Sequence, residues 1–394
     1  MTQKPVKLAI VGGHRGASFN KALARLQERV ALTAVCDLSE AVLTAWRVEY
    51  PGISAFGSYD ELLEKADCDA VFICTPLLLH ADQAVRALEA GKHVLSEVVA
   101  AATLDDCWRL VETVERTGRV YMLAENYCYM RPNMLVRNMA DQGVFGEPVY
   151  AEGAYIHDCR ALLFTPEGRL TWRGEYRHWL NGNSYPTHSL GPVAQWLGVG
   201  RRDRLVSAAT WMTPAVAAQA YARELLGSER AGLTAQGWQL GDSATTVIQT
   251  ERGAVIVLRV DWSSPRPHNM THYVLQGTQA AYLSARYEQE DPLIWIDGRS
   301  PGNSPMGTAQ WEALWAHAER YEHPYWRELG GEALRSGHGG GDFFVLKDFC
   351  EAVQAGTQPA IDVYDAATWS AIVPLSVESV SRGGAPVAVP NFRR

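Results

Sequence analysis

The sequence lacks the patterns that mark several large classes of proteins. No apolar run reaches about 18 residues, the length that a transmembrane helix needs, and the N-terminus, MTQKPVK, lacks the apolar stretch of a secretory signal. Neither basic nor acidic residues form long blocks, and a net charge of −8 gives no attraction to nucleic acid or to an anionic membrane. We therefore expect a cytoplasmic protein whose partner is a small molecule.

The cysteine and histidine patterns of metal and disulfide proteins are also missing. The seven cysteines are scattered and odd in number, none pairs as CxxC, and the 11 histidines include no HExxH motif. We expect buried free thiols and no metal. The length of 394 residues and the 47% hydrophobic content predict two or three domains with a sizeable core.

The stretch from Lys7 to Asp37 has the pattern of a strand, a glycine-containing turn, a helix and a second strand. The strands are the apolar runs Leu8 to Val11 and Leu32 to Cys36, and helical spacing joins them through Leu26. Glycines let backbone N–H groups approach a pyrophosphate at a helix N-terminus, and a carboxylate at the end of the second strand can accept hydrogen bonds from ribose hydroxyls. The turn is not a literal GxGxxG, so an ordinary strand-to-helix turn is the alternative.

This stretch predicts NAD as the cofactor, because Asp37 would repel the 2′-phosphate of NADP. The predicted cofactor-binding residues here are Gly12, Gly13, His14, Arg15, Gly16 and Asp37.

Strands and helices keep alternating to about residue 126. Apolar strands at 70–74, 93–95 and 120–124 are separated by helical segments at 80–90 and 104–117. This pattern predicts an α/β domain over residues 1–126 with a doubly wound parallel sheet, whose ligands bind outside the carboxyl ends of the strands. The predicted cofactor-binding residues at those ends are Thr75, Pro76, His80, Glu97 and Asn126.

The remaining chain, 127–394, predicts an α+β domain for substrate binding and oligomerisation, with an open and mostly antiparallel sheet. Its apolar runs are longer and alternate, and helices are expected at 189–197, 342–355 and 363–380. Residues 283–340 are rich in Gly, Pro and Trp and are interpreted as long loops around a site or a subunit contact. The tail could return to the first domain. The exposed face of such a sheet needs cover, so we expect a homodimer or homotetramer.

Two strings of the first domain, TPLLLH from Thr75 and AGKHVLSE ending at Glu97, resemble the signatures of the Gfo/Idh/MocA oxidoreductases. The second family signature normally continues with Lys-Pro, and that lysine helps catalysis beside the nicotinamide. Here Val98 follows Glu97, and a valine cannot donate or accept a proton. The lysine mechanism of the family's sugar dehydrogenases is therefore not expected.

Four further strings resemble the NAD-dependent glycoside hydrolases of the α-N-acetylgalactosaminidase type. They are ENxxY from Glu125, EGAYIHD from Glu152, GNxYPTHxLGP from Gly182 and HGGxDF from His338. By motif, the resemblance implies that Glu125, Tyr155, Tyr185 and His188 flank the nicotinamide and the sugar as the catalytic residues.

The resemblance implies a glycosidase that does not attack the anomeric carbon directly. Such an enzyme oxidises the C3 hydroxyl of the sugar, eliminates the anomeric substituent across C1 and C2, adds water and reduces C3 again, so that NAD is recycled. His188 is expected as the base for the C3 hydroxyl, because an unperturbed histidine titrates near neutral pH. The alternatives are an NAD-dependent sugar or cyclitol dehydrogenase and a nucleotide-binding sensor without turnover.

Several basic residues near these motifs are predicted to bind the substrate. Arginine's planar guanidinium suits an anionic or acetamido group, although a surface ion-pair cluster is an equally good interpretation. For the HGGxDF string the alternative is a flexible loop before a helix capped by Asp342. The predicted substrate-binding residues are Arg173, Arg177, His178 and His338.

Overall fold

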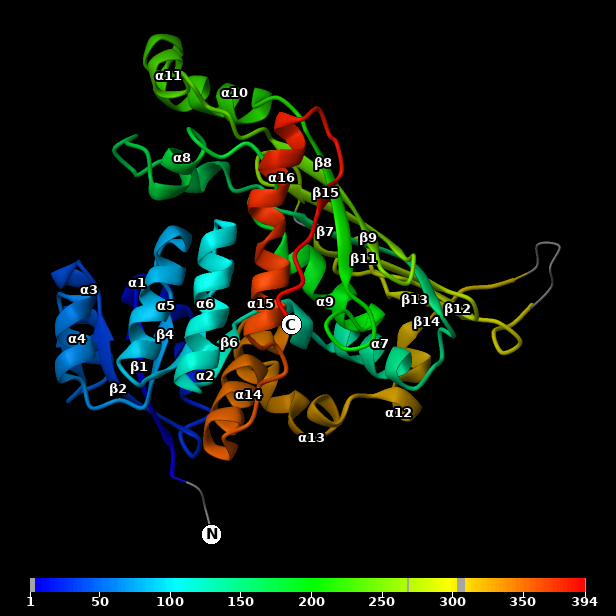
Figure 1. Cartoon of the computed structure of the whole chain (residues 1–394), viewed down its shortest axis with the longest axis horizontal. Coiled ribbons are helices and arrows are strands. Elements are labelled where there is room, and N and C mark those ends of the chain that lie inside the picture. The colour runs from blue at the N-terminus through cyan, green and yellow to red at the C-terminus, as the bar shows by residue number, and fades with distance from the viewer. Residues whose placement is uncertain (1–3, 268, 303–308, 394) are drawn as a thin grey trace. The chain divides into compact units, whose positions relative to one another are not determined.

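The computed structural model describes residues 4–267, 269–302 and 309–393. The chain divides into two compact units, each described here by itself. The first unit contains Met1–Arg131, His323–Ala371 and Phe392–Arg394, and the second contains Pro132–Glu322 and Ile372–Asn391. A parallel sheet in the first unit and a mostly antiparallel sheet in the second confirm the predicted fold class (Figure 1).

The sheet of the first unit has six parallel strands in the order β3-β2-β1-β4-β5-β6. Its central strand β4 is buried at every position, which is typical of a strand covered on both faces and explains the continuous apolar run in the sequence. The strands are β1 (Val6–Val11), β2 (Val30–Cys36), β3 (Ser54–Phe56), β4 (Ala70–Ile73), β5 (His93–Ser96) and β6 (Tyr121–Leu123).

The helices of the first unit come from both ends of the chain. Figure 1 shows the orange helices α14 and α15 beside the blue and cyan elements, and they pack against α2 and α6 respectively. The α-helices are α1 (Gly13–Gly16), α2 (Asn20–Leu23), α3 (Glu40–Glu49), α4 (Tyr59–Lys65), α5 (His80–Glu89), α6 (Leu104–Thr117), α13 (Pro324–Ala333), α14 (Gly341–Ala355) and α15 (Val363–Ser370). Short 3₁₀ turns are η1 (Ala17–Phe19), η2 (Leu77–Leu79), η3 (Asn126–Tyr129) and η6 (His338–Gly340).

The helix predicted after the glycine turn is observed, but its predicted extension to Leu26 is wrong. The segment forms α1, η1 and α2, and regular helix ends at Leu23. The carbonyl of Leu26 accepts the N–H groups of Arg29 and Val30, so the chain turns toward β2 at this point. Leu26 is still buried, which is why its spacing looked helical in the sequence.

The sheet of the second unit has nine strands in the order β14-β13-β12-β11-β7-β10-β9-β8-β15. Neighbouring strands are antiparallel except for β7 and β10. Helix α9 packs against β7, β10 and β11, and α16 packs against β8. The strands are β7 (Pro148–Ile156), β8 (Leu205–Met212), β9 (Ser243–Thr250), β10 (Val255–Asp261), β11 (Asn269–Gly277), β12 (Ala280–Leu283), β13 (Leu293–Ile296), β14 (Glu312–Ala313) and β15 (Val387–Ala388).

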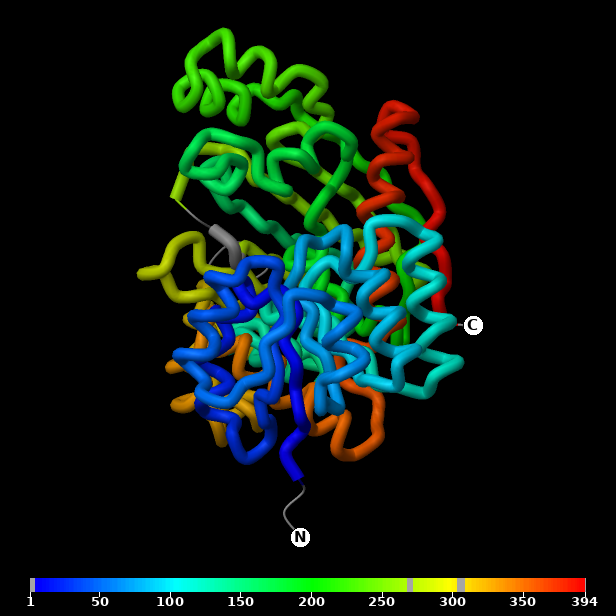
Figure 2. The backbone as a smooth tube through the Cα atoms, turned by 90° about the vertical axis from the view of Figure 1, so that its left-hand side faces the viewer, coloured from blue at the N-terminus to red at the C-terminus, as the bar shows by residue number. Residues whose placement is uncertain are grey.

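The second unit also contains helices that the sequence analysis missed. Helices α10 and α11 pack against each other and are the adjacent green helices in Figure 2. Their buried alanines join Leu163, Phe164 and Trp238 in a separate small core. The helices and 3₁₀ turns of this unit are α7 (Arg131–Asp141, beginning one residue before the division), η4 (Arg160–Leu163), α8 (Trp172–Tyr176), α9 (Thr187–Leu197), α10 (Val216–Leu226), α11 (Ser228–Thr234), η5 (Leu314–His317), α12 (Ala318–Tyr321) and α16 (Ile372–Ser381).

Two predictions about the later part of the chain need correction. The loops predicted at 283–340 contain β13, β14, α12 and α13, while 303–308 lie outside the described residues. Helix α13 was missed because Gly330 and Gly331 weaken its helical pattern, although His323 caps it and Pro324 starts it. The helix predicted at 363–380 is two helices, α15 and α16, assigned to different units.

A close approach between β7 and α9 fixes the centre of the second unit. A Cβ atom on Gly153 would collide with the backbone carbonyl of Ser189, so only glycine fits at this point of β7. The buried hydroxyl of Tyr273 on β11 donates to the carbonyl of His188 at 2.6 Å. The first turn of α9 is therefore held against the sheet by a backbone contact and by a side-chain hydrogen bond.

We predict that Gly153→Ala destabilises the protein by about 1–3 kcal/mol, the usual cost of overpacking a close contact. The midpoint of urea unfolding, followed by circular dichroism, measures this effect. Gly232→Ala is the matched control, because Gly232 lies in α11 with no neighbour near its missing Cβ, and alanine favours a helix. Equal midpoints for Gly153→Ala and the wild type would show that the two elements can separate without cost.

Candidate functional site

The glycine turn after β1 has the geometry of a nucleotide-binding turn. Gly12 has φ 90°, and a Cβ atom there would collide with the carbonyl of Cys74 at the end of β4. Gly13 begins α1, and its carbonyl accepts the indole N–H of Trp46 at 3.0 Å. Both glycines thus bring the backbone of the turn close to the strand ends, where turns of this kind hold a phosphate.

Asp37 lies at the end of β2 beside this turn. Its carboxylate accepts the backbone N–H of His14 at 3.1 Å and that of Ser39 at 2.9 Å. The two hydrogen bonds fix the carboxylate next to the glycine turn, the position that the cofactor prediction requires. The residues of the turn therefore fit an adenine dinucleotide.

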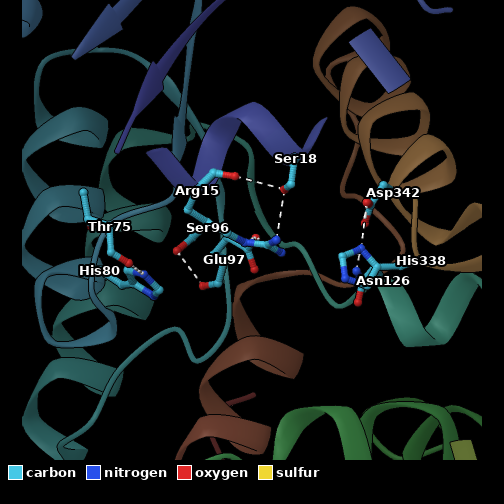
Figure 3. A network of polar contacts seen from close by, with 9 residues as sticks. All are labelled: Arg15, Ser18, Thr75, His80, Ser96, Glu97, Asn126, His338 and Asp342. Carbon is cyan, nitrogen blue, oxygen red and sulfur yellow. Dashed lines mark hydrogen bonds and ion pairs between the residues drawn. The ribbon is translucent and has the colours of Figure 1, made fainter. Parts of the chain in front are cut away.

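Arg15 and Glu97 were both predicted to bind the cofactor, and the structure joins them to each other. Nε of Arg15 donates to Oε1 of Glu97 at 2.8 Å, and the same guanidinium reaches the hydroxyl of Ser18 at 2.9 Å (Figure 3). Glu97 is largely buried, whereas Arg15 is more exposed. Val98, which follows Glu97, is buried and apolar. The ion pair thus holds the loop after β5 against the turn after β1.

His80 is buried rather than exposed at the strand ends. Its two ring nitrogens lie 2.7 Å from the carbonyl oxygens of Val99 and Thr75. Burial lowers the pKa of His80, and the two carbonyls oppose this effect. The ring joins the segments that follow β4 and β5, so this placement favours an indirect role in cofactor binding. Pro76 precedes η2 directly, and the hydroxyl of Thr75 donates to Gln83.

The strand β6 leads into two buried polar residues. The carboxylate of Glu125 lies at the start of η3 and accepts the N–H of Tyr127 at 3.3 Å. The side-chain amide of Asn126 donates to Oδ1 of Asp342 at 2.8 Å, and Oδ2 of Asp342 bonds Nδ1 of His338 at 2.8 Å (Figure 3). The structure therefore joins a predicted cofactor residue and a predicted substrate residue through Asp342.

Asp342 does not cap α14, so the alternative interpretation of the HGGxDF string, a loop before a helix capped by Asp342, is wrong about the cap. Helix α14 begins at Gly341 with Gly340 as its N-cap, and no side chain caps it. The carboxylate of Asp342 is instead used by Asn126 and His338. The signal in the sequence was the spacing of four residues between His338 and Asp342.

In the second unit the structure brings three predicted catalytic residues together. The ring of His188 lies 5.0 Å from that of Tyr155 and 5.1 Å from that of Tyr185, between ring centres. The two tyrosine rings are 5.4 Å apart. Tyr155 lies on β7 and His188 on α9, so the contact of Gly153 with Ser189 brings these two side chains together, and Tyr185 lies in the segment before α9. His188 is 7% exposed, which leaves its ring within a mostly enclosed cluster.

Two aromatic residues that the sequence analysis did not select extend this cluster. His157 lies 5.7 Å from Tyr155, and Trp262 lies 5.1 Å from Tyr185, between ring centres. Trp262 also lines a small pocket, whose other lining residues are Gly182, Ser184, Met212, Leu240, Gly241, Asp242, Ala244 and Val260. His157 lies two residues after Tyr155, within the EGAYIHD string, so the sequence did carry a signal for it.

The segment before α9 is anchored inside the second unit. The backbone N–H of Asn183 donates to the hydroxyl of Ser376 at 2.7 Å, and its amide donates to the hydroxyl of Thr246 at 3.2 Å. These contacts tie the segment to α16 and β9. They fix the backbone that carries Tyr185, and so fix the direction of its side chain.

The predicted substrate-binding residues of the second unit have different environments. Arg177 is fully buried, and its guanidinium donates to the carbonyl of Leu240 at 2.9 Å and to the hydroxyl of Ser263. Burial lowers the pKa of Arg177 to about 10, and Asp242 opposes this effect. This placement favours a structural role for Arg177 over contact with substrate.

Arg173 and His178 remain partly accessible. The guanidinium of Arg173 lies 4.2 Å from the ring centre of Trp172. Nε2 of His178 accepts the indole N–H of Trp238 at 3.2 Å. The guanidinium of Arg173 therefore keeps polar edges that a ligand can reach, whereas one nitrogen of His178 is already used.

Two features of the whole chain complete the description. All seven cysteines are buried and free, as predicted. Within the described ranges no helix has the length and apolar character to cross a membrane.

Comparison with known proteins identifies the two parts of the chain. Residues 6–125 match the oxidoreductase family with an NAD-binding Rossmann fold, which confirms NAD as the predicted cofactor. Residues 129–394 match the C-terminal domain of glycosyl hydrolase 109. Solved structures give the same fold: the levoglucosan dehydrogenase complex with NADH has a TM-score of 0.79 at 18% identity, covering 98% of this chain and 100% of that chain. An inositol dehydrogenase homologue from Azotobacter vinelandii has a TM-score of 0.72 at 19% identity, covering 98% of each chain.

Curated relatives extend over nearly the whole chain. A glycosyl hydrolase family 109 protein of Solibacter usitatus is 37% identical, covering 99% of this chain and 88% of the relative. The alpha-N-acetylgalactosaminidase of Bacteroides fragilis is 36% identical, covering 99% of this chain and 92% of the relative. With a family model over most of its length and relatives this similar, the chain belongs to glycosyl hydrolase family 109.

Proposed function

We propose that this protein is an NAD-dependent glycosidase that oxidises a ring hydroxyl, eliminates the aglycone, adds water and restores the hydroxyl. The observation that carries the proposal is the contact of His188 with Tyr155 and Tyr185 in the unit that matches the hydrolase domain. The cluster supplies groups that transfer protons, and the other unit supplies a fold that binds NAD. The relative named alpha-N-acetylgalactosaminidase supports a glycoside as the substrate.

The first unit would hold the cofactor at its glycine turn and strand ends. Gly12 and Gly13 provide the close backbone approach for the pyrophosphate, and Asp37 accepts the ribose hydroxyls. Arg15 and Glu97 hold the adjoining loops in place. When bound, NAD⁺ accepts a hydride from the sugar and gives it back later in the same cycle.

His188 is proposed as the base for the hydroxyl that is oxidised. The O–H proton moves to a ring nitrogen of His188, and the same proton returns to oxygen when the carbonyl is reduced again. Tyr273 fixes the backbone of His188, and the two tyrosine rings restrict the position of its side chain. A histidine held in this way can take up and return a proton without leaving the cluster.

Tyr155 and Tyr185 are proposed as hydrogen-bond donors and proton relays. Oxidation at C3 makes the C2–H bond acidic. The C2 proton leaves through the tyrosine relay and is delivered to the departing aglycone oxygen, while negative charge develops on the C3 carbonyl oxygen. A phenol O–H can donate to that oxygen and so stabilise the charge. Glu125 is proposed to hold a ribose or sugar hydroxyl, and Arg173 and His178 remain proposals for substrate contact.

We also propose that the protein is cytoplasmic and forms a homodimer or homotetramer. Seven free thiols are typical of a reducing compartment. The face of the sheet of the second unit that carries Val247 and Val257 is only partly covered, and Trp211 on this face is 52% exposed. A second copy of the chain is the proposed cover, and light scattering tests the mass of the assembly.

We predict that the wild type binds NAD at least about tenfold more tightly than NADP, because the carboxylate of Asp37 opposes a 2′-phosphate. Asp37→Ser should reduce this preference, since serine can still bond a ribose hydroxyl but carries no charge. Calorimetric titration with both cofactors measures the ratio. Tighter binding of NADP by the wild type contradicts the role given to Asp37.

We predict that His188→Asn folds normally and loses about 10²–10⁴-fold in turnover, the usual loss for a positioned acid or base. Release of nitrophenol from nitrophenyl glycosides measures turnover, and circular dichroism checks the fold. His323→Asn is a matched control, because asparagine can also cap α13. Near-normal turnover of the folded His188→Asn protein would remove His188 from the chemistry.

The product formed in D₂O tests the proposed function itself. We predict that the released sugar carries deuterium at C2, because the proton removed there exchanges with solvent before water addition completes the cycle. NADH should not accumulate, and removal of NAD should stop the release of sugar. NMR of the product and absorbance at the NADH band measure these outcomes.

The same experiment separates the two enzyme functions. One NADH formed per substrate with no aglycone released would favour the sugar dehydrogenase. Aglycone release without NAD, with protium fully retained at C2, would favour direct displacement at the anomeric carbon.

A further inference from the structure

A histidine in an unfavourable backbone conformation lies directly before α14. His338 has φ 44°, and in the described ranges it is the only residue other than glycine with a positive φ. A Cβ atom makes this left-handed region unfavourable, so such residues persist only where the surroundings hold them. Residues of this kind concentrate at functional sites.

The surroundings of His338 are built around one buried carboxylate. Asp342 is 1% exposed, and its two oxygens are bonded to Asn126 and to Nδ1 of His338, each at 2.8 Å. A Cβ atom on Gly337 would collide with the same carboxylate, so the loop passes close to it. Both oxygens of the carboxylate are thus bonded, and its bond to Nδ1 orients the imidazole.

The other ring nitrogen of His338 has no such partner. Nδ1 is used by Asp342, whereas no described residue bonds Nε2, and the side chain is 35% exposed. Because Asp342 is an acceptor only, Nδ1 carries a proton. Protonation of the ring therefore puts a proton on Nε2, which makes this atom a hydrogen-bond donor directed away from Asp342.

Three charged residues act on His338. Asp342 raises the pKa of His338 and Glu97 adds to this effect, whereas burial and Arg15 oppose it, and the net direction is upward from the ordinary value near 6.5. The stabilisation from protonated His338 is therefore complete below the unfolded pKa and is lost as the pH rises through the folded pKa. At neutral pH a larger share of the rings is protonated than for a free histidine.

His338 also belongs to the edge of the first unit where the cofactor binds. Asn126 follows strand β6, and Glu97, which acts electrostatically on His338, follows strand β5. Figure 3 shows His338, Asp342 and Asn126 together with Arg15 and Glu97, the ion pair beside the glycine turn. The carboxyl ends of parallel strands are where such sheets bind their ligands.

We propose that His338 is a cofactor-binding residue whose protonated ring donates a hydrogen bond from Nε2 to an oxygen of NAD. Asp342 and Asn126 are the positioning residues. The sequence predicted His338 as a substrate contact, and this inference gives it a different ligand. It concerns cofactor binding alone, so it holds for the glycosidase and for the dehydrogenase.

The first test follows His338 by NMR in the full-length protein freed of nucleotide. A pH titration of the imidazole signals, assigned with His338→Asn, gives the pKa of His338 with and without NAD⁺. We expect the pKa to rise when NAD⁺ binds, because the hydrogen bond favours the protonated ring. Binding of NAD⁺ with no change in the pKa of His338 overturns the proposal.

The second test measures the affinity for NAD⁺ by calorimetry between about pH 6 and 9. We expect the wild type to lose about tenfold in affinity as the pH rises, in line with the loss of one hydrogen bond from a charged donor. The affinity of His338→Asn for NAD⁺ should depend less on pH, because asparagine does not ionise. Asparagine is chosen because it tolerates a positive φ and can bond Asp342. Equal pH dependence in the two proteins also overturns the proposal.

A second variant and a second ligand define the contact. Asp342→Asn should lower the pKa of His338 and shift the loss of affinity to lower pH, provided that circular dichroism shows a folded protein. If this variant does not fold, the comparison of wild type with His338→Asn still decides the proposal. ADP-ribose locates the acceptor: a pKa change with ADP-ribose assigns a phosphate or ribose oxygen, and a change with NAD⁺ alone assigns the nicotinamide half.

Discussion

The contact between β7 and α9 at Gly153 is the constraint on which the candidate chemistry of the second unit depends. Only a residue without a Cβ allows the strand to meet the carbonyl of Ser189. Two residues further along β7 stands Tyr155, and one residue before Ser189 stands His188. The backbone contact therefore places the two side chains together, with ring centres 5.0 Å apart. A cluster set by backbone packing loses less conformational freedom when it binds a ligand than one carried on a loose loop.

The sequence predicted the first unit well because its parallel strands are buried on both faces. The strand predicted at 70–74 is observed as Ala70–Ile73, and that predicted at 93–95 as His93–Ser96. Such strands form short apolar runs between helices, a pattern that depends little on the rest of the fold. Helices α10 and α11 were missed because their core is formed partly with Leu163 and Phe164, which lie far earlier in the sequence. Helical spacing alone does not reveal a core of this kind.

In the candidate site, too, the features marked by local sequence patterns were predicted, and those that depend on contacts between distant residues were not. Tyr155, Tyr185 and His188 were selected because each lies in a recognisable string, and the structure brings them together. The hydrogen bond between Asn126 and Asp342 joins residues 216 positions apart, so local spacing gives no sign of it. The sequence also contains no sign that Arg177 is buried. It has the sequence context of a ligand-binding arginine, yet its guanidinium is bound by protein groups inside the second unit.

The composition of the cluster bears on the type of reaction. Direct displacement at an anomeric carbon uses two carboxyl groups on opposite sides of the bond. The ring contacts around His188 involve tyrosine, histidine and tryptophan, and two buried carboxylates of the same unit are used by the backbone. Asp242 accepts the N–H groups of Ala217 and Ala218 at the start of α10, and Asp261 accepts those of Ser263 and Ser264.

A carboxylate bonded in this way stabilises its own segment and is poorly placed to attack a sugar. The groups in the cluster are tyrosines, histidines and a tryptophan, and the tyrosines and histidines suit removal of protons from O–H bonds and stabilisation of an enolate oxygen. Oxidation at C3 acidifies the proton on C2, and loss of that proton expels the anomeric substituent, so proton transfers suffice to break the glycosidic bond. The chemistry of the second unit thus depends on the NAD fold of the first, and a glycosidase built on a dehydrogenase fold needs no carboxylate pair.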